Sequence, residues 1–412
     1  MSDRGRALRF CLLATFYPPW NFGGDGIQVQ RLAHALADGG HSVTVVCSPL
    51  VHRLLSRRRE PAPPPHPGVE VVPLREDPVS LTRTYLRGRP FRARQQLEEV
   101  LGRGHDVVHF HNPSLIGAPE LLRMGDGVKL YTAHEQWLLC PSHALWRRSG
   151  RVCESPPCPT CEIEHLRPPQ PWRHTDLLDR ALPELDALIA PSRTSAALHR
   201  RFAGLTRIEV IQHFVPPAPG AAAAPDPELT RPYFLYVGRL EPIKGVRSLI
   251  DAFRRRADQD LVIAGDGGLR RRLKLAAARL PNVRFTGWLS QEQLDPLYRG
   301  ALGVVLPTRG HEAFSLAGVE AFARGVPVVA HGFGAQAELI EDTSAGLTYR
   351  DQDGLDAALD LIASDPRGRS EMGALGLEAA RGRYSPEAHL DRYLGLVREL
   401  AAQRQREAGA AA

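Results

Sequence analysis

The stretch PTRGHEAFSLAGVEAFARGVPVVA, Pro307 to Ala330, contains the pattern that predicts the fold of this chain. The apolar run just before it, Leu302 to Leu306, reads as a buried strand that stops at the proline. A polar loop follows, then a helix from Phe314 to Phe322 and a second buried strand from Val326 to Val329. Buried strands that alternate with helices are typical of a parallel α/β sheet.

Two carboxylates frame this unit, Glu312 at the entrance of the predicted helix and Glu320 about two turns inside it. Eight helical residues give about 80° of net rotation, so the two side chains need not share one stripe. We therefore expect them to reach different parts of one extended ligand, with the free N–H groups of the helix start offered to an anion. Two solvated helix carboxylates are the alternative that the spacing alone leaves open.

The composition of the chain indicates a soluble, globular protein of two domains. It has 412 residues, of which 43% are hydrophobic and 24% charged. No apolar run approaches the roughly 20 residues of a membrane span. The first apolar run, Leu8 to Phe16, follows arginines as in a signal peptide, but no small-residue cleavage site comes after it. We interpret it as the first core strand and expect a cytoplasmic protein.

The chain carries a formal charge of +6 and has a pI near 9.1. Its arginines gather in two clusters, in residues 53–59 and residues 83–94. A solvated surface is one interpretation, and attraction to the anionic inner face of a membrane or to an acidic acceptor is the other. Few aromatic residues stand among the arginines, so we expect no nucleic-acid partner.

The first half of the sequence predicts a strand, a glycine-rich loop, a helix and a strand in that order. The strands are Arg9 to Tyr17 and Ser42 to Cys47, and the loop NFGGDG spans residues 21–26. Such a βαβ unit takes a right-handed crossover. Gly23 and Gly24 allow the backbone to approach a ligand, so we expect this loop to face a phosphate or a sugar.

Three histidines stand near the ends of two further strands, DVVHFH at residues 106–111 and KLYTAH at residues 129–134. In an open parallel sheet the ligand lies outside the carboxyl ends of the strands. His109, His111 and His134 all lie near such ends, and we expect them to position substrate by hydrogen bonds rather than to act as bases.

Four cysteines cluster in the segment CPSHALWRRSGRVCESPPCPTC, residues 140–161. They are Cys140, Cys153, Cys158 and Cys161, with the spacing Cys-x12-Cys-x4-Cys-x2-Cys. Thiolates at such spacing, separated by turn residues, fit a tetrahedral structural zinc site. Reduced thiols and disulfides are the alternatives, although disulfides are unusual in the cytosol.

A Pro- and Ala-rich stretch without periodicity, residues 216–231, predicts a linker between two domains. The first domain then covers residues 1–215, including the Cys-rich insertion, and the second covers residues 232–385. Residues 386–412 predict a C-terminal helix that packs back toward the first domain, followed by a tail.

The second domain begins with a buried strand, Tyr233 to Val237, and the turn GRLEPIKG at residues 238–245. Arg239 has the forked geometry that phosphate accepts, and Lys244 adds a point charge. Two cations in a turn that opens a helix predict a diphosphate site. Both halves of the chain are therefore Rossmann-like, and we expect a cleft between them.

These motifs together resemble the retaining glycosyltransferases of family four, which have two facing Rossmann-like domains, the GT-B architecture. The resemblance covers nearly the whole chain and is carried by YVGRLEPIKG, IAGDGG, HEAFSLAGVE and GVPVVA, with support from NFGGDG and TAHE. The stretch HEQWLLCP with its downstream cysteines is similar to a Cys-containing branch of this family.

The resemblance implies a role for each matching residue. Arg239 and Lys244 would bind the donor diphosphate. Glu312 would contact the transferred sugar, and Glu320 would hold the ribose of the nucleotide. His134 would border the sugar and the acceptor, and with Arg239, Lys244 and Glu312 it completes the expected catalytic set. The donor-binding residues would further include Gly23, Gly24, Gly238, Phe314, Ser315 and Leu316.

The sequence departs from the family pattern at the sugar end of this site. The usual Glu-Gly-Phe-Gly is replaced by Glu312-Ala313-Phe314-Ser315, which keeps the loop small but reshapes the sugar pocket. The usual Gly-Gly before the next helix is replaced by HGFG at residues 331–334, and the backbone N–H groups from Phe333 to Ala335 are further candidate sugar contacts.

The resemblance implies transfer of a sugar from a nucleotide-sugar donor to a glycan, lipid-linked or small-molecule hydroxyl, with retention at the anomeric carbon. The two cations would replace a catalytic metal, since no Asp-x-Asp motif stands in the segments that line the predicted cleft. We thus expect no cofactor for catalysis and zinc only as a structural ion. A nucleotide-sugar epimerase of GT-B fold is the alternative, and a binding-only relative is disfavoured because both cations and both glutamates are present.

Overall fold

The computed structural model describes residues 6–21, 23–56, 64–147, 149–154, 159–165, 167–200, 205, 207–218 and 229–411. The chain divides into two compact units. Unit 1 contains Met1–His143, Ser155–Gln212 and His389–Ala412, and unit 2 contains Ala144–Glu154 and His213–Ala388. The C-terminal segment therefore belongs to the N-terminal unit, and part of the Cys-rich segment belongs to the C-terminal unit.

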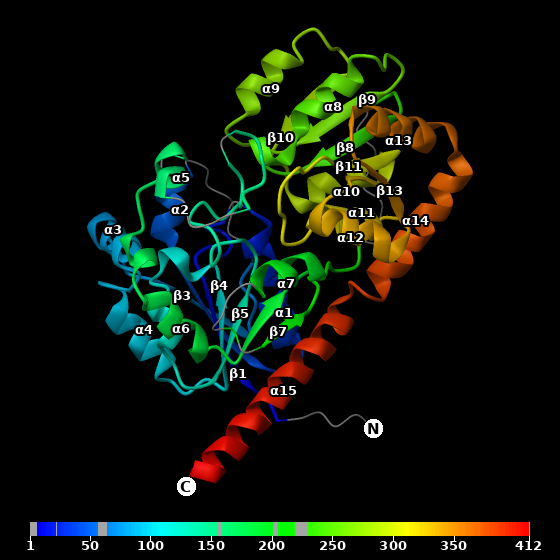
Figure 1. Ribbon diagram of the computed structural model, residues 1–412. Helices are drawn as coiled ribbons and strands as arrows, with labels where there is room; N and C mark the ends of the chain where they lie inside the picture. Colours follow the sequence, from blue (N-terminus) through cyan, green and yellow to red (C-terminus); the bar gives the residue numbers. More distant parts are fainter. Residues whose placement is uncertain are drawn as a thin grey trace. The chain divides into compact units, whose positions relative to one another are not determined.

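Unit 1 is built on a parallel sheet of seven strands in the order β3-β2-β1-β4-β5-β6-β7 (Figure 1). The strands are β1 Arg9–Ala14, β2 Ser42–Cys47, β3 Val69–Pro73, β4 Val107–His111, β5 Val128–Thr132, β6 Ala187–Ala190 and β7 Ile208–Val210. The helices associated with it are α1 Gly24–Asp38, α2 Pro49–Leu55, α3 Pro78–Arg87, α4 Arg94–Leu101, α5 Pro159–Glu164, α6 Leu177–Ala181, α7 Arg193–His199 and α15 Pro386–Ala411.

Apolar side chains cover both faces of this first sheet, as strands buried on both sides require. On one face, Leu32 of α1 and Tyr393 and Val397 of α15 pack in one core with Phe10 of β1. On the other face, α4 and α6 pack against the same strands through a second core. The long C-terminal helix thus completes the layer that α1 begins.

Unit 2 is built on a second parallel sheet, with six strands in the order β10-β9-β8-β11-β12-β13. The strands are β8 Tyr233–Val237, β9 Asp260–Ala264, β10 Val283–Gly287, β11 Gly303–Leu306, β12 Val328–His331 and β13 Gly346–Tyr349. The helices are α8 Val246–Phe253, α9 Arg270–Ala276, α10 Gln291–Gly300, α11 Leu316–Phe322, α12 Gly334–Thr343, α13 Gln352–Ser364 and α14 Pro366–Arg381. One core lies under α8, α9 and α13, and the other under α10, α11 and α14.

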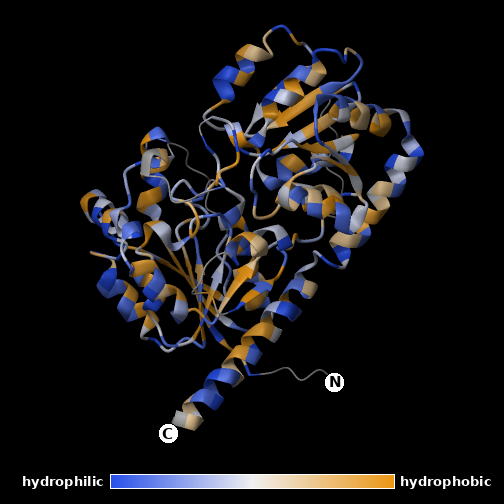
Figure 2. Cartoon of the chain, viewed as in Figure 1, coloured by the Kyte–Doolittle hydropathy of each residue, from blue (hydrophilic) through white to orange (hydrophobic). Residues whose placement is uncertain are grey.

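Both units therefore have a parallel sheet with helices on both faces, which confirms the predicted pair of Rossmann-like α/β sheets. Figure 2 shows the strands of both units mostly in the hydrophobic colour, with hydrophilic residues on the helices. Among the residues that the structure describes, no helix combines the length and the apolar character needed to cross a membrane.

The elements of the stretch 307–330 differ from the predicted bounds for local reasons. The strand β12 begins at Val328 instead of Val326, because Pro327 has no N–H to give to a neighbouring strand. The N–H of Val326 instead donates to the carbonyl of Ala321 at 3.0 Å, which closes the turn after α11. The helix α11 begins at Leu316, two residues later than predicted.

Candidate active site

The loops after β8 and β11 meet at the topological switch point of the second sheet. From β8 the chain proceeds to β9 and β10 on one side, whereas from β11 it proceeds to β12 and β13 on the other. Ligands of open parallel sheets bind outside the carboxyl ends of the strands at such a point. The loop after β8 carries Arg239 and Lys244, and the loop after β11 carries Glu312, so all three residues lie at this edge.

Close backbone contact between these two loops requires a glycine. A Cβ atom added at Gly245 would lie 2.1 Å from the carbonyl oxygen of Pro307. Gly245 also has a φ of +67°, in the left-handed region that side chains disfavour. The N–H of Arg309 donates to the carbonyl of Ile243 at 2.9 Å. The two loops are therefore fixed to one another before any ligand arrives.

Lys244 and Glu312 form an ion pair across these loops. Their side chains are 21% and 24% exposed, so both charged groups remain accessible to a ligand. An incoming phosphate can take the Lys244 ammonium as a charge-assisted donor. The carboxylate that it releases is then an acceptor for sugar hydroxyls.

Arg239 lies at the exposed rim of the same loop. Its side chain is 53% exposed and pairs with Glu241 at 2.5 Å. Its carbonyl accepts a hydrogen bond from the hydroxyl of buried Tyr236 at 2.8 Å. A Cβ at Gly238 would lie 2.9 Å from that hydroxyl, so this position also needs a glycine. The loop thus presents an exposed guanidinium on a backbone that Tyr236 holds in place.

Glu320 lies deeper than Glu312, on α11. It is 5% exposed, and its carboxylate accepts hydrogen bonds from the Tyr298 hydroxyl at 3.1 Å and from Gln291 Nε2 at 3.3 Å. A buried carboxylate requires such donors. Because α11 begins at Leu316, Glu312 belongs to the loop and Glu320 to the helix. The structure therefore places the two carboxylates at different depths.

Aromatic packing holds the segment between the two carboxylates. The Phe314 ring meets the His213 and Tyr384 rings edge-on, with centroids 5.4 and 5.9 Å away. Ser315 is the N-cap of α11, and its side chain makes no capping hydrogen bond to the helix that Leu316 opens. The Ser315 side chain therefore leaves the first N–H groups of α11 uncapped, and these groups can donate to a ligand oxygen.

Gly23 and Gly24 lie at the start of α1 in unit 1. Gly23 is the N-cap, and the Asn21 side chain makes two hydrogen bonds to it. Asn21 Nδ2 donates to the Gly23 carbonyl at 2.8 Å, and the Gly23 N–H donates to Asn21 Oδ1 at 3.3 Å. A glycine cap has no side-chain acceptor for the first helical N–H groups. Such a helix start, at the carboxyl edge of a parallel sheet, suits an anionic ligand.

The three histidines at the ends of β4 and β5 form one buried row in unit 1. His111 Nδ1 lies 2.8 Å from His134 Nε2, and the His109 ring centroid lies 3.9 Å from that of His111. His109 is hydrogen-bonded to Thr132 at 2.8 Å and to the Tyr393 hydroxyl at 3.0 Å. His109 therefore links α15 to the sheet, whereas His134 lies at the other end of the row.

Burial decides the protonation of His109 and His134. It lowers the pKa of His134 to about 4, although the charge of Glu135 acts in the opposite direction. Burial also lowers the pKa of His109 well below its ordinary value. His134 is therefore neutral at pH 7 and can position a ligand by hydrogen bonding. Because one ring of the His111–His134 pair must donate and the other accept, their tautomers are linked.

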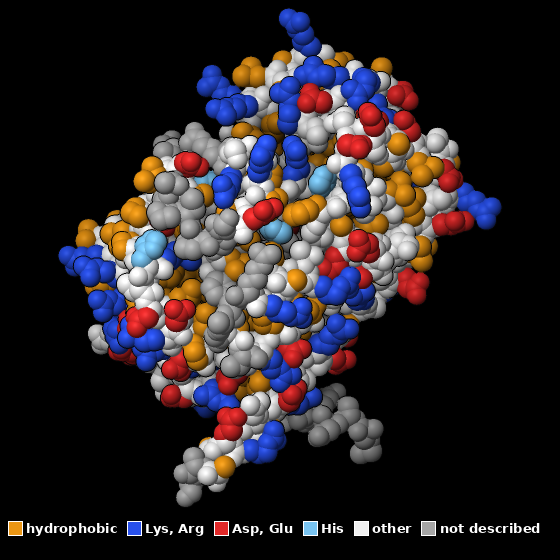
Figure 3. Space-filling model, in the orientation of Figure 1, with side chains coloured by type: hydrophobic (Ala, Val, Ile, Leu, Met, Phe, Trp, Pro, Cys, Tyr) orange, Lys and Arg blue, Asp and Glu red, His pale blue; other side chains and the backbone are white. Residues whose placement is uncertain are grey.

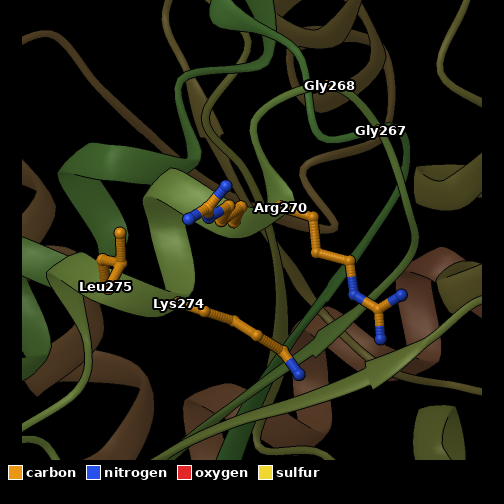
Figure 4. Close-up of a pocket in the computed structure, with 6 residues that line it drawn as sticks. Gly267, Gly268, Arg270, Lys274 and Leu275 are labelled. Carbon is orange, nitrogen blue, oxygen red and sulfur yellow. The ribbon is translucent and has the colours of Figure 1, made fainter.

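A basic surface with an open hollow of about 540 Å³ lies beside the loop that carries Arg239. Figure 3 shows Lys and Arg side chains gathered over the part of unit 2 that contains α8 and α9. The side chains of Arg270 and Lys274, one helical turn apart, point the same way from α9 (Figure 4). The N–H of Leu240 donates to the carbonyl of Asp266 at 2.9 Å and ties the two loops together. The hollow is lined by Gly267, Gly268, Arg270, Arg271, Lys274 and Leu275.

The Cys-rich segment is divided between the two units. Cys140 and Cys161 are buried in unit 1 and Cys153 is buried in unit 2, whereas Cys158 lies outside the described residues. The described cysteines form no disulfide. Within the described residues, no three His, Cys, Asp or Glu side chains are grouped as a metal site would require. The zinc site therefore stays a prediction.

Several residues that shape the site escape motif analysis. Tyr298 and Gln291, which hold the Glu320 carboxylate, stand on a helix without any recognisable motif. Asn112, with a φ of +47°, donates to Asp25 at 2.9 Å and links the end of β4 to the start of α1. The one available signal is position, because Asn112 directly follows a predicted strand that ends in histidines.

Two family models match the chain, one in each half. The model described as Glycosyltransferase Family 4 matches residues 22–218, and the model described as Glycosyl transferases group 1 matches residues 222–377. The first range contains the Gly23 loop and the histidine row, and the second contains the loops with Lys244 and Glu312.

A GDP-mannose-dependent alpha-mannosyltransferase of Mycolicibacterium smegmatis is 31% identical over 365 residues, which cover 85% of this chain and 87% of the relative. The chain belongs to glycosyltransferase family 4. A glycogen synthase of Mycobacterium tuberculosis is 28% identical over 390 residues, 87% of each chain. The resemblance read from the motifs is thereby confirmed, and the chain is a glycosyltransferase; the Cys-containing branch stays a prediction.

The fold of this glycosyltransferase is shared with solved structures. Sucrose-phosphate synthase from Thermosynechococcus elongatus superposes with a TM-score of 0.71, covering 97% of this chain and 100% of the other. The two sequences are 21% identical, so this likeness concerns the fold alone. It confirms the predicted GT-B class.

Proposed function

We propose that this glycosyltransferase moves a sugar from a nucleotide-sugar donor to an acceptor hydroxyl, with retention of configuration at the anomeric carbon. The observation that carries the proposal is the Lys244–Glu312 pair at the switch point of the second sheet. It sets a cation suited to a diphosphate beside a carboxylate suited to sugar hydroxyls. The related mannosyltransferase is described as GDP-mannose-dependent, which supports a nucleotide-sugar donor for this chain as well.

The donor extends over residues at different depths in this proposal. Lys244 and Arg239 bind the diphosphate, and Glu312 turns from Lys244 to the hydroxyls of the transferred sugar. Glu320, held by the Tyr298 hydroxyl, accepts from the ribose. The N–H groups at Ser315 and beyond, at the start of α11, receive a donor oxygen.

The bond changes balance without a protein nucleophile. The acceptor oxygen bonds to the anomeric carbon on the face from which the diphosphate leaves, as the bond between that carbon and the phosphate oxygen breaks. The departing phosphate oxygen takes the acceptor proton. Lys244 and Arg239 stabilise the charge that develops on the leaving group. His134, neutral because burial lowers its pKa to about 4, positions substrate and does not carry the proton away.

We further propose that turnover requires no divalent metal. The diphosphate needs positive charge in the transition state, and Lys244 and Arg239 supply it from one short loop. Turnover unchanged by a chelator supports this role of the side chains. A rate that collapses with the chelator and returns with Mg²⁺ contradicts it.

Labelled nucleotide sugars test the proposed reaction. The enzyme is incubated with each donor, with and without a panel of hydroxyl acceptors, and the nucleotide and the sugar products are separated. Release of nucleotide that rises with an acceptor, together with labelled glycoside, supports transfer. Isomerisation of the sugar in the absence of any acceptor would instead support a GT-B epimerase and would contradict the transferase proposal.

Contact with an anionic membrane is proposed for the face that α3 presents. Val79 is 63% exposed and shares one helical stripe with the exposed arginines Arg83 and Arg87, which stand four and eight residues later. An apolar side chain with two cations suits the headgroups of anionic lipids. Sedimentation with anionic vesicles, and not with neutral ones, is expected for the full chain. The reversal Arg83→Glu/Arg87→Glu should abolish it, whereas Arg279→Glu in unit 2 should not.

We also propose that the Cys-rich segment holds a structural zinc ion. The spacing of the four cysteines and the burial of the three described ones support it. Bound zinc would contribute folding free energy and would take no part in the transfer.

A further inference from the structure

Three basic side chains stand in a row at the carboxyl edge of the second sheet. Arg309 follows β11, His331 ends β12 and Arg350 follows β13. Those three strands are neighbours in the sheet, and His331 lies opposite Tyr349, the residue before Arg350. The topology thus places Arg309, His331 and Arg350 side by side, and we name them the basic row.

The stems of both arginines are held against the backbone of neighbouring loops. A Cβ at Gly245 would lie 3.3 Å from Cγ of Arg309, and one at Gly332 would lie 3.5 Å from Cγ of Arg350. The N–H of Gly332 donates to the carbonyl of Tyr349 at 2.7 Å, which joins the ends of β12 and β13. Stems held in this way lose less conformational entropy when their guanidinium groups bind a ligand.

Gln336 ties together the loops that carry the basic row. This side chain is 1% exposed, and its Nε2 donates to the carbonyl of Thr308 at 2.5 Å and to that of His331 at 3.2 Å. Thr308 directly precedes Arg309. The loops after β11 and β12 therefore form one hydrogen-bonded platform under the row.

Among the residues that the structure describes, no carboxylate forms an ion pair with the two arginines of the basic row. Arg309 and Arg350 are both exposed. Burial first, and then the positive charge of Arg309, lower the pKa of His331, so at neutral pH the two arginines carry the charge of the basic row. Other arginines of unit 2 do have carboxylate partners: Arg239 with Glu241, Arg255 with Asp356, Arg299 with Asp295 and Arg383 with Asp342.

The basic row adjoins the loops of the donor site. Arg309 donates from its N–H to Ile243, the residue before Lys244, and it stands three residues ahead of Glu312. We propose that the basic row binds a carboxylate or phosphate group of the substrate, carried by the transferred sugar or by the acceptor, in addition to the donor diphosphate. This inference rests on the proposed transfer reaction and narrows its substrates to an anionic class.

Two matched pairs of probes test the inference and separate its two sources. The first pair is UDP-glucuronic acid and UDP-glucose, which differ by one carboxylate on the sugar. The second pair is glucose 6-phosphate and glucose, which differ by one phosphate and are added in the presence of saturating UDP. Affinities are measured by calorimetry on the full chain and on Arg309→Gln, Arg350→Gln and the double variant. Arg272→Gln, an exposed position of α9 outside the hollow, is the control.

In at least one pair the charged probe should bind at least about 10-fold more tightly than the neutral one. The double variant should reduce that preference to less than about twofold, and the control should keep it. Equal affinity within both pairs overturns the inference. So does equal weakening of charged and neutral nucleotide sugars in the double variant, because the arginines would then serve the diphosphate. Failure of the transfer proposal itself has a different readout, namely labelled nucleotide sugar that gives no glycoside with any acceptor or is isomerised without one.

Discussion

Replacement of Lys244 by alanine tests the proposed stabilisation of the leaving group. Loss of one preorganised charge contact in a transition state typically costs about 10²–10³ in kcat, or about 2.7–4 kcal/mol. The variant also leaves Glu312 without its cation in front of the diphosphate. Two unit charges about 4 Å apart interact by about 4 kcal/mol at an effective dielectric constant of 20, so KM for the donor should rise as well. We therefore expect kcat to fall by at least about 100-fold.

Stability measurements separate this effect from unfolding. The pair is more than one fifth exposed on each side, and such partly solvated pairs contribute only about 0–1 kcal/mol to stability. Lys244→Ala should therefore melt within a few degrees of the wild type. Arg247→Ala is the matched control, because it removes an exposed cation from the neighbouring helix and from its pair with Asp251.

Turnover of labelled donor is the assay, with the double variant Lys244→Ala/Glu312→Ala measured beside the single ones. Because the two side chains form one pair, the double variant should lose less than the sum of the single losses. A kcat for Lys244→Ala within about threefold of the wild type, or a loss that follows the melting temperature, refutes the reasoning.

Further predictions concern the ribose site, pH and zinc. Glu320→Ala should weaken nucleoside diphosphate binding by about 10-fold in calorimetry, and Tyr298→Phe should weaken it less; no change in either variant contradicts the ribose role. Burial lowers the pKa of His134, His199 and His389 to about 4, so the unfolded state binds more protons than the folded state between about pH 4 and 6.5. The unfolding free energy should therefore rise with pH in that window and level off above it. His199→Gln should flatten this urea-unfolding profile by up to about 1.4 kcal/mol per pH unit; an unchanged slope speaks against the assignment. Native mass spectrometry should find one zinc per chain, lost in Cys140→Ser with a lower melting temperature, and a metal-free wild type would end the zinc proposal.

The sequence predicts the position of the candidate site residues better than their partners. Arg239, Lys244 and Glu312 all follow buried apolar runs, and the carboxyl ends of parallel strands lie at one edge of a sheet. A motif search together with this rule therefore leads to the edge of the sheet where the structure places all three residues. The late start of β12 could also have been read from Pro327, which cannot donate a hydrogen bond to a neighbouring strand.

Pairing between distant residues could not be predicted in the same way. The Lys244–Glu312 pair depends on β8 lying next to β11, and nothing in the local pattern states which strands are neighbours. The hydrogen bond between the His109 ring and the Tyr393 hydroxyl joins residues 284 positions apart in the sequence. The amphipathic pattern of α15 predicts that Tyr393 is buried, but it does not predict which polar group forms a hydrogen bond with the Tyr393 hydroxyl.

The anomeric configuration of the first product tests the proposed retaining transfer most directly. An α-linked nucleotide sugar is supplied to the enzyme in D₂O, with an acceptor or with water in its place, and the anomeric proton is followed by NMR from the first turnovers. Retention predicts that the wild type forms an α-configured glycoside or, with water, an α-configured free sugar before mutarotation. The rate of product formation should fall at least about 100-fold in Lys244→Ala. A β-configured first product contradicts the proposed departure and attack on one face.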